Sequence, residues 1–540
     1  MMLGVMKRSV FLVGPSGSGK TTAGRLLADR LGARFVDTDA EIERIAGRAI
    51  PEIFATNGES AFRALERRIV AQLSEEGPAV VSTGGGAPVD DESRRAMHKA
   101  GTIVWLDAPS DVLLARLTAT GAHDRPLLAG DAKATLNRLR EERRFAYAEA
   151  DLRIDTSTLT PERIAAMIAA DLEQLAGIDT VWVHAPSRTY PVYVGTGVLD
   201  RAGQFFTQQG LDGMLRVIAD ERVAELHGER LRRGLGDLLQ EWYPIPAGEE
   251  HKTLNQAYRL YDALLADKPE RRDVIVAFGG GVIGDLAGFV AATLLRGLSF
   301  VQIPTTVLSQ VDSSVGGKVG VDHPAGKNLI GAFHQPSLVL ADLDILHTLD
   351  ARQIAAGWAE VVKIAVVQDA ALFEELERSA DALAALDADA ARSAIRRAIA
   401  LKAGLVEQDE HDTKGIRAVL NYGHTIGHAI EAASDYAGFL HGEGVAVGMA
   451  AAAHIAERMG LHPADAVERQ SLLLRRLGLP QASPDLPRDK VEEALTLDKK
   501  RARGKIAWIL PNGLGRVVVR ADVPESLVQE ALELIGAEGA

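Results

Sequence analysis

Short apolar runs that end in polar or glycine-rich residues recur along the first third of the chain, and segments with helical periodicity separate them. The runs lie at Ser9–Val13, Ala33–Val36, Ala79–Val81, Thr102–Leu106 and Leu152–Ile154. Strands that alternate with helices build a mainly parallel sheet with helices on both faces. A further amphipathic stretch follows Pro161 and runs to about Leu175, so the pattern predicts a first α/β domain over residues 1–175.

Strand-like segments resume after a short linker, which we place at residues 176–180. Strand patterning restarts at Val181, and further candidate strands lie at Tyr190–Val194, Arg216–Ile218, Val274–Phe278, Phe300–Ile303 and Leu338–Leu340. Beyond about Leu349 the chain is rich in Ala, Leu and Glu with helical periodicity. Lys505–Arg520 is typical of a hairpin that turns at Asn512-Gly513. We therefore expect an α/β part over residues 181–348 and a mainly α-helical part over 349–540.

Composition narrows the class of protein. A chain of 540 residues is too long for one hydrophobic core, and its 47% hydrophobic and 25% charged residues are typical of globular domains without membrane-spanning stretches. The net charge of -14 argues against a general nucleic-acid surface. The chain has no cysteine, so a metal must be held by histidine and carboxylate. The first apolar run leads into a phosphate-loop motif without a cleavage site, so we expect a cytoplasmic protein.

A phosphate-binding motif follows the first predicted strand. Residues 14–21, with the sequence GPSGSGKT, match the pattern GxxxxGK[ST] and precede a helical segment. In this motif the backbone N–H groups and the helix dipole point at the phosphates, the lysine reaches the β and γ oxygens, and the final hydroxyl holds magnesium. The sequence therefore predicts a site for ATP with Mg(II), formed by Gly14, Ser16, Gly17, Ser18, Gly19, Lys20, Thr21 and Thr22.

Three features indicate what receives the phosphate. Asp37 and Asp39 stand at the end of the second predicted strand, on the edge where open α/β sheets bind ligands. Gly84-Gly85-Gly86 ends the third strand, where a ligand can approach the bare backbone. The third feature is a set of arginines, namely Arg63, Arg125 and Arg143. Taken singly, each feature also fits an ordinary cap, turn or surface charge.

Six segments in this order and spacing resemble shikimate kinase, from Lys7 to about Leu175: GPSGSGKT, FVDTD, FRALE, STGGGA, RPLL and RRFAY. The resemblance implies that Lys20 acts on the transferred phosphate, that Asp37 joins Thr21 at magnesium, and that Asp39 binds and deprotonates the acceptor hydroxyl. It implies that shikimate contacts Asp39, Arg63, Gly84, Gly85, Gly86 and Arg143, with the neighbouring Arg144 as an open alternative to Arg143. Arg125 would close onto the nucleotide phosphates as a catalytic residue.

A second glycine-rich segment follows the predicted strand at Val274–Phe278. Residues 279–285, with the sequence GGGVIGD, contain GxGxxG at a helix start, which favours a dinucleotide pyrophosphate over a plain turn. Gln310–Lys318 and Gly326-Lys327-Asn328 add two Gly- or Ser-rich elements with lysines. Lysines beside such loops indicate a second anion.

Metal ligands are available in the helical part. His424 and His428 are four residues apart, on one face of a predicted helix, and His441 follows in His441-Gly442-Glu443-Gly444. Glu360 supplies a carboxylate. Spacing alone does not choose among the three histidines, and two histidines on one helix face are more often not ligands.

Nine segments resemble 3-dehydroquinate synthase over nearly all of residues 180–540: AGEEHKT, GGGVIGD, LRG, PTTVLSQVDSSVGGK, GKN, AEVVK, NYGHTIGHAIE, HGEGVAVGM and LDKK. The resemblance implies Zn(II) or Co(II) on Glu360, His424 and His441. It implies NAD on Asp220, Glu249, Lys252, Gly281, Asp285, Thr305, Thr306, Lys318, Lys327 and Thr348. It implies substrate on Asp312, Lys318, Asn328, Lys363, Lys402, Arg417, Asn421 and His428. Among these, Lys318, Asn328, Lys363 and His428 would be catalytic.

The resemblance implies two further substrate contacts. One leaves a choice between two lysines, and the other comes from a second subunit. A lysine of Asp498-Lys499-Lys500 would meet the substrate carboxylate, and we assign Lys500 with Lys499 as the alternative. Arg296 would reach the substrate phosphate from the neighbouring subunit, so we expect a homodimer through the C-terminal domain.

Together the resemblances imply a bifunctional enzyme of the shikimate pathway that acts on small molecules and binds neither nucleic acid nor membrane. One alternative keeps the architecture and changes the substrates, with a deoxy-inosose synthase type of cyclase fused to a gluconate-type kinase. A second alternative is that one domain is a catalytically dead nucleotide-sensing or scaffolding module.

Overall fold

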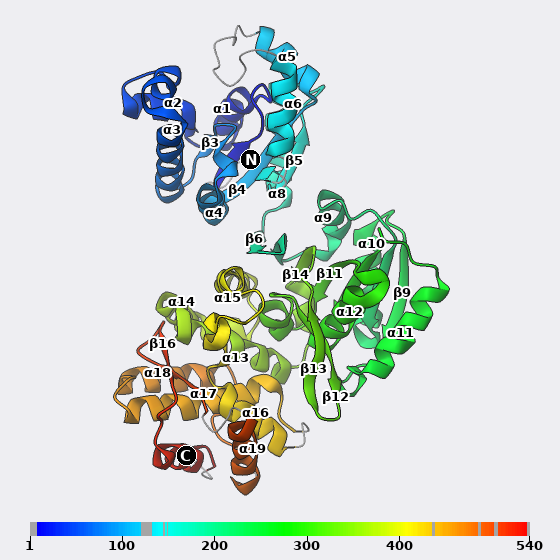
Figure 1. The fold of residues 1–540 in the computed structure, drawn as a ribbon, viewed down its shortest axis with the longest axis vertical. Coiled ribbons are helices and arrows are strands. Elements are labelled where there is room, and N and C mark those ends of the chain that lie inside the picture. The colour runs from blue at the N-terminus through cyan, green and yellow to red at the C-terminus, as the bar shows by residue number, and fades with distance from the viewer. Residues whose placement is uncertain are drawn as a thin grey trace. The chain divides into compact units, whose positions relative to one another are not determined.

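The computed structural model describes residues 8–119, 132–143, 146–147, 149–434, 438–483, 488–501 and 506–536. The chain divides into two compact units, Met1–Ala176 and Gly177–Ala540, and each is treated by itself below. Figure 1 labels their helices and strands.

The first unit is built on a five-stranded sheet in which all neighbours are parallel, in the order β2-β3-β1-β4-β5. Its strands are β1 (Ser9–Val13), β2 (Phe35–Asp37), β3 (Val80–Ser82), β4 (Gly101–Asp107) and β5 (Leu152–Asp155). Its helices are α1 (Lys20–Leu31), α2 (Thr38–Ala46), α3 (Ile50–Glu75), α4 (Asp91–Ala100), α5 (Ser110–Ala119), α6 (Ala132–Glu142) and α8 (Pro161–Gln174). The five strands predicted from the apolar runs are confirmed.

Alternation along β1 explains why helices cover both faces of this sheet. Phe11 and Val13 pack in one core with Ile69 of α3 and Met97 of α4. Val10 and Leu12 point the other way, into a core with α1 and α8. A strand buried on both faces is apolar throughout, which is the pattern that the sequence shows. The carboxyl ends of β1, β2 and β3 then lead into the motifs at residues 14–21, 37–39 and 84–86.

The second unit begins with a seven-stranded sheet in the order β6-β7-β14-β11-β10-β8-β9. Its strands are β6 (Ile178–Ala185), β7 (Arg188–Gly195), β8 (Leu215–Asp220), β9 (Gln240–Ile245), β10 (Val274–Gly279), β11 (Ser299–Pro304) and β14 (Leu338–Asp342). The helices along this part are α9 (Ala202–Gln208), α10 (Glu221–Leu235), α11 (Leu254–Ala266) and α12 (Gly281–Thr293). Only β6 and β7 pair antiparallel, so the sheet is mainly parallel.

The predicted linker at residues 176–180 is too long. Strand β6 starts at Ile178, because Ile178, Asp179 and Thr180 already pair with Gly195, Val194 and Tyr193 of β7. Backbone pairing with β7 thus begins three residues before Val181, where the strand pattern in the sequence starts. The boundary between the two units falls between Ala176 and Gly177.

Three strands of the second unit were not predicted. Strand β9 lies at the sheet edge, and strands β12 (Lys318–His323) and β13 (Gly326–Phe333) form a separate antiparallel hairpin. The hairpin packs on α12 through Val319 and Val321. It therefore holds the Gly-rich segments around Lys318 and Asn328 in regular backbone pairing instead of loops.

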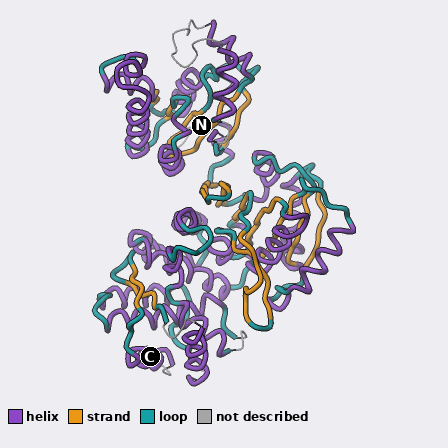
Figure 2. The backbone as a smooth tube through the Cα atoms, in the orientation of Figure 1, coloured by secondary structure: helices purple, strands orange, loops and turns teal. Residues whose placement is uncertain are grey.

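The rest of the second unit is mainly helical, as predicted, and Figure 2 shows helix dominating after the large sheet. The elements are α13 (Ala351–Gln368), α14 (Ala370–Ala384), α15 (Ala388–Gln408), α16 (His424–Ala433), α17 (His441–Arg458), α18 (Ala464–Arg476), α19 (Arg488–Arg501), β15 (Trp508–Pro511), β16 (Val517–Arg520) and α20 (Glu525–Gly536). The predicted hairpin forms as β15 and β16. Within the described ranges, no helix is both long and apolar enough to cross a bilayer.

Candidate active sites

The phosphate loop runs from β1 into α1. Gly14, Gly17 and Gly19 have φ values of 135°, 86° and 94°, which side-chain-bearing residues rarely adopt. Lys20 Nζ donates to the backbone carbonyls of Gly14 at 2.8 Å and Pro15 at 3.0 Å, so the lysine spans its own loop. Ser16 and Ser18 lie within the loop, and Thr21 and Thr22 follow Lys20 on the first turn of α1.

The predicted magnesium residues lie together. The Thr21 hydroxyl donates to Asp37 Oδ2 at 2.8 Å and lies 3.3 Å from Ser82 Oγ. Asp37 also caps α2, because its Oδ1 accepts the backbone N–H groups of Asp39 and Ala40. This capping fixes the carboxylate at the end of β2 while Oδ2 stays directed at Thr21. The group offers hard oxygen donors, which Mg(II) prefers.

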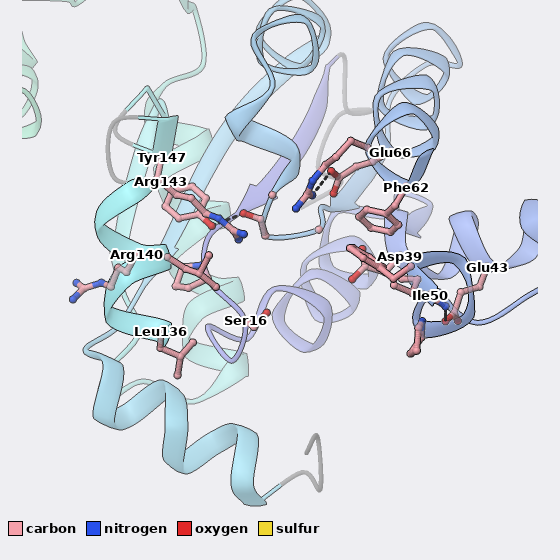
Figure 3. A pocket seen from close by; sticks show the side chains of 18 residues that line it. Ser16, Asp39, Glu43, Ile50, Phe62, Glu66, Leu136, Arg140, Arg143 and Tyr147 are labelled. Atoms are coloured by element: carbon pink, nitrogen blue, oxygen red, sulfur yellow. Dashed lines mark hydrogen bonds and ion pairs between the residues drawn. The ribbon is translucent and has the colours of Figure 1, made fainter. Parts of the chain in front are cut away.

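A cavity of about 330 Å³ opens beside the phosphate loop. In Figure 3, Asp39, Phe62 and Glu66 approach it from α2 and α3, while Arg143 and Tyr147 approach from the opposite side and Ser16 lies between. The residues that line it include all those predicted to bind shikimate, namely Asp39, Arg63, Gly84, Gly85, Gly86 and Arg143. Apolar walls with a few charged groups suit a small carboxylated ring with hydroxyl groups.

The three glycines form the floor between the charged side chains. A Cβ on Gly84 would meet Glu66 and Asp39, one on Gly85 would come 3.2 Å from Arg143, and one on Gly86 would collide with Arg63. Bare backbone at these positions therefore lets the charged groups converge. The Tyr147 hydroxyl donates to the carbonyl of Gly85 at 2.6 Å and holds this segment.

Glu66 is a site residue that sequence reasoning missed. Its carboxylate is 2% exposed and accepts from Arg63 NH1 at 2.7 Å. Burial raises the pKa of Glu66, although the Arg63 charge opposes the shift. The signal was available, because Arg63 and Glu66 are three residues apart and so share a helix face. Predicted residues Arg125 and Arg144 lie outside the described residues.

A cavity of about 240 Å³ in the second unit lies at the start of α12. Its lining contains five of the residues predicted to bind NAD: Asp220, Gly281, Thr305, Thr306 and Thr348. Asp220 also caps α10 by accepting the N–H of Val223 at 3.1 Å. His227 was missed, and its Nε2 lies 2.9 Å from the Thr348 hydroxyl. A helix start beside a cavity is a favourable place for a pyrophosphate.

Four of the remaining predicted NAD residues, Glu249, Lys252, Asp285 and Lys327, form a charged cluster around Lys252 that is not part of that lining. Lys252 Nζ lies 3.1 Å from Glu249, 3.3 Å from Asp285 and 2.8 Å from Asn328 Oδ1, and Lys327 lies 3.6 Å from Glu249. Burial raises the pKa of Asp285 to about 6, against the opposing charge of Lys252. The cluster brings the hairpin residues Lys327 and Asn328 to α12 and the loop before α11.

Lys318 is held by a residue that sequence reasoning missed. Its Nζ lies 2.6 Å from Asp412 Oδ2, although the two residues are far apart in the chain. The loop that carries Asp412 is fixed by Asp409, whose carboxylate accepts three backbone N–H groups, from Thr413, Lys414 and Ile416. No local pattern links Lys318 to Asp412, so this pair could not be predicted from the sequence.

Three side chains in the helical part could hold a metal ion. Among the described residues, ligand atoms of Glu360, His424 and His441 lie within 4.8 Å of one another. Glu360 Oε1 lies 3.8 Å from His424 Nε2 and 3.5 Å from His441 Nε2. Two imidazoles and one carboxylate suit Zn(II) or Co(II) and leave coordination positions open for substrate. The geometry therefore selects His441 over His428 as the second histidine.

Neighbouring charges keep Glu360 ionised and burial keeps His424 neutral, which are the states in which these side chains bind a metal. Burial would raise the pKa of Glu360, but Lys363 and the two histidines hold it well below its usual value. Burial lowers the pKa of His424 to about 3, so its imidazole is neutral. Burial opposes charge on His441 as well, yet Glu360 and Glu431 raise its pKa to about 10. A cation at this centre would replace the proton on His441.

The predicted substrate residues gather around the same centre. Lys363 forms an ion pair with Glu360. Lys402 Nζ donates to Asp312 Oδ1 at 2.5 Å, and the lysine charge lowers the pKa of Asp312 against the effect of burial. Arg417 is buried and donates to the Glu410 carbonyl.

Of four further predicted substrate residues, one lies beside the metal ligands, two others are exposed, and one has its side chain outside the described part of the structure. The His428 ring lies 5.1 Å from the His424 ring. Asn421 is exposed just before α16. Arg296 is exposed after α12 with a left-handed φ of 68°. Lys499 and Lys500 lie on α19, but their side chains are outside the described part of the structure.

Comparison with family models divides the chain in the same way. Residues 16–173 match the model described as shikimate kinase. Residues 242–356 match the model described as 3-dehydroquinate synthase N-terminal, and residues 357–501 match 3-dehydroquinate synthase C-terminal. The first match covers the phosphate loop from Ser16 and most of the cavity beside it, and the other two cover the metal residues and the dinucleotide residues except Asp220.

Individual proteins resemble the second unit. The 3-dehydroquinate synthase of Roseobacter denitrificans is 48% identical over 364 residues, which are 66% of this chain and 98% of that protein. The 2-epi-5-epi-valiolone synthase ValA of Streptomyces hygroscopicus, solved with NAD+ and Zn2+, is 31% identical, covers 64% of this chain and 96% of its own, and gives a TM-score of 0.59. A 2-deoxy-scyllo-inosose synthase with carbaglucose-6-phosphate, NAD+ and Co2+ is 30% identical, covers 65% and 99%, and gives 0.61.

Proposed function

We propose that this chain, which belongs to the 3-dehydroquinate synthase family and carries a shikimate kinase domain ahead of it, catalyses two separate reactions of the shikimate pathway. The first unit transfers phosphate from ATP with Mg(II) to shikimate and forms shikimate 3-phosphate. The second converts 3-deoxy-D-arabino-heptulosonate 7-phosphate to 3-dehydroquinate and phosphate. The observation that carries the proposal is that each unit gathers the groups of one reaction, around Gly84–Gly86 and around Glu360.

In the kinase, phosphoryl transfer depends mainly on positioning and on neutralising charge. Lys20 would move from the carbonyls of its own loop to the transferred phosphate, and Thr21 and Asp37 would hold Mg(II). Arg63 and Arg143 would hold the carboxylate of shikimate. Asp39 lies on the cavity wall, where it can accept the proton of the attacking hydroxyl.

In the synthase, NAD supplies a transient oxidation of a secondary alcohol, and a metal on Glu360, His424 and His441 supplies polarisation of the oxygen at that carbon. The chain's own residues orient the substrate and neutralise its phosphate. Lys363 and Lys402 lie beside Glu360 and Asp312, so the substrate binds between alternating charges. His428 would accept or return a proton near the phosphate, which leaves before the ring re-forms.

The dinucleotide has two groups of partners. Asp220, Gly281, Thr305, Thr306 and Thr348 line the cavity at the start of α12 and would hold its ribose and pyrophosphate. Glu249, Lys252, Asp285 and Lys327 form the charged cluster outside that lining and would be the second group. Because the proposed conversion involves no net oxidation or reduction, NAD would act as a catalyst and would not be consumed.

A related cyclase activity is the second candidate, because the two solved cyclases described above share the fold of the second unit. Identity favours the leading proposal, since the dehydroquinate synthase of Roseobacter denitrificans reaches 48% while the cyclases reach 30–31%. The match of residues 16–173 to shikimate kinase argues against the gluconate-type partner.

Mass-spectrometric product analysis of the purified chain tests the proposal. We expect shikimate 3-phosphate from ATP and shikimate, and 3-dehydroquinate with phosphate from the heptulosonate phosphate, without net reduction of added NAD+. Turnover of glucose 6-phosphate with no turnover of the heptulosonate phosphate would contradict the synthase assignment. Phosphorylation of gluconate with none of shikimate would contradict the kinase assignment.

We further propose a cytoplasmic homodimer in which Arg296 reaches the active site of the partner subunit. The exposed side chain and left-handed backbone of Arg296 support a role outside its own subunit, because strained backbone concentrates at functional positions. Mixing an Arg296→Ala chain with an inactive Lys363→Ala chain tests the exchange. Recovery of synthase activity in the mixture is expected, and its complete absence from verified mixed dimers would contradict the proposal.

A further inference from the structure

His441 lies between two carboxylates. On one side its Nε2 is 3.5 Å from Glu360 Oε1, within the group of ligand atoms described above. On the other side its Nδ1 is 2.7 Å from Oε1 of Glu431, a residue of α16 that is only 7% exposed. The two imidazole nitrogens therefore have separate partners, and Glu431 contacts the nitrogen that does not face the other ligands.

We propose that Glu431 is a positioning residue of the metal centre, which accepts the Nδ1–H of His441 and so keeps the Nε2 lone pair directed at the metal. A neutral imidazole carries one N–H, and the hydrogen bond made by one nitrogen decides which nitrogen is free to bind a metal. This inference rests on the proposed metal at Glu360, His424 and His441. Glu431 is the last residue of the segment NYGHTIGHAIE, and no role for it was predicted from the sequence.

The other histidine ligand is held in a different way. His424 Nδ1 lies 3.2 Å from the backbone carbonyl of Tyr422, which is a neutral acceptor that no side-chain substitution removes. A carboxylate acceptor on His441 adds negative charge and makes that imidazole the stronger donor to a cation. The contribution of Glu431 is therefore separable by mutation, whereas that of Tyr422 is not.

Close helix packing holds Glu431 against His441. Glu431 follows His424 by seven residues and His428 by three, so all three lie on one face of α16. At the facing start of α17, a Cβ on Gly444 would lie 3.1 Å from the Gly427 carbonyl and 3.6 Å from Glu431. Small residues on both helices thus bring the Glu431 carboxylate within one hydrogen bond of His441.

Metal affinity of the full-length protein tests the inference directly. We would measure the dissociation constant of Zn(II) by competition with a chromophoric chelator for the unsubstituted chain, Glu431→Ala and Glu431→Gln. Loss of such a partner typically weakens metal binding by ~10–100-fold, so we expect a loss of that size for Glu431→Ala. Glu431→Gln keeps an acceptor oxygen without the charge, so we expect a smaller loss.

A tautomer measurement separates positioning from general destabilisation. Nitrogen-15 shifts of His441 in the metal-loaded protein should show Nδ1 protonated in the unsubstituted chain, and a weaker Nδ1–H hydrogen bond in both variants. Glu375→Gln is the matched control, because its carboxylate is also part-buried and bonded, to Ser393 and Arg397, but lies on α14. We expect Zn(II) affinity in this control to equal that of the unsubstituted chain.

Two outcomes would count against the inference in different ways. Zn(II) affinity and histidine shifts in Glu431→Gln that equal those of the unsubstituted chain would overturn the role of Glu431 and leave the proposed function intact. If the unsubstituted chain itself bound no Zn(II) or Co(II), the proposed metal centre would fail, and the role of Glu431 with it. Should Glu431→Ala fail to fold, Glu431→Gln still decides the question.

Discussion

Gly86 and Arg63 are packed so closely that a side chain on residue 86 would displace the guanidinium of Arg63. A Cβ on Gly86 would come within 3.0 Å of all three of the nearest guanidinium atoms of Arg63. Arg63 is held from its other side by Glu66 at 2.7 Å, so the guanidinium cannot easily retreat. The glycine at position 86 therefore sets where Arg63 presents its charge to the cavity.

Gly86→Ala should impair the kinase by displacing Arg63. Displacement of a positioning group by about 1 Å can cost ~100-fold in rate, so we expect kcat/KM for shikimate to fall by at least ~10-fold. Steady-state kinetics at saturating ATP would measure the change. The synthase activity of the same chain is the internal control and should stay unchanged. Kinase activity equal to that of the unsubstituted chain would show that Arg63 is not positioned by this contact.

The KM for shikimate should depend on the ionisation of Glu66. Burial raises the pKa of this carboxyl, so it takes up a proton at a higher pH than an exposed glutamate would. Above that pKa Glu66 is charged and holds Arg63, and as pH falls through it the ion pair is lost. We therefore expect KM to rise on the acid side, by about tenfold, the order of one charged hydrogen bond.

Glu66→Gln isolates this effect, because glutamine stays neutral at every pH. Its KM should be raised at neutral pH and should lack the acid-side rise that Glu66 causes, so that the two pH profiles converge in acid. An identical acid-side rise in both proteins would assign the titration to another group.

Gly442→Ala should weaken the metal centre from outside its ligand set. A Cβ on Gly442 would come within 3.0 Å of the backbone carbonyl of Ala356, and backbone cannot turn aside as a side chain can. Helix α17 must then move away from α13, which separates His441 from Glu360. Overpacking of this kind costs ~1–3 kcal/mol of stability, and we expect Zn(II) to raise the unfolding midpoint less than in the unsubstituted chain.

Gly404→Ala is the control for that substitution. Gly404 lies in α15, where a Cβ would meet nothing within 4 Å, so alanine there should stabilise the helix by ~0.5–1 kcal/mol. The shift that Zn(II) causes in its unfolding midpoint should stay unchanged. An equal loss of that shift in both variants would mean that helix separation is not the cause.

Fully buried strands could be predicted from the sequence, whereas three partly exposed ones, β9, β12 and β13, could not. Strands such as β1 and β10 are buried on both faces and therefore appear as continuous apolar runs. Strand β9 lies at the sheet edge with mixed exposure and contains Pro244, a residue that argues against a strand in the sequence. The β12–β13 hairpin was hidden because its glycines and lysines also fit a ligand-binding loop.

The residues of the two candidate sites also divide into those that could be predicted from the sequence and those that could not. Motif residues such as Lys20, Asp39 and Glu360 could be named from the sequence because ligand chemistry dictates both their type and their spacing. Glu66 and Glu431 were missed although each shares a helix face with a named residue, since their role is to hold other side chains. Asp412 could not be found at all, because only the tertiary fold brings it to Lys318.

The most direct test of two independent active sites in one chain is to assay both reactions in Lys20→Ala and in Glu360→Ala. Lys20 spans the phosphate loop and Glu360 is the carboxylate of the metal centre, in separate units of the fold. We expect Lys20→Ala to lose phosphorylation of shikimate while releasing phosphate from the heptulosonate phosphate at the normal rate, and Glu360→Ala to do the reverse. Loss of both activities in either folded variant, or of neither in both, would contradict the account.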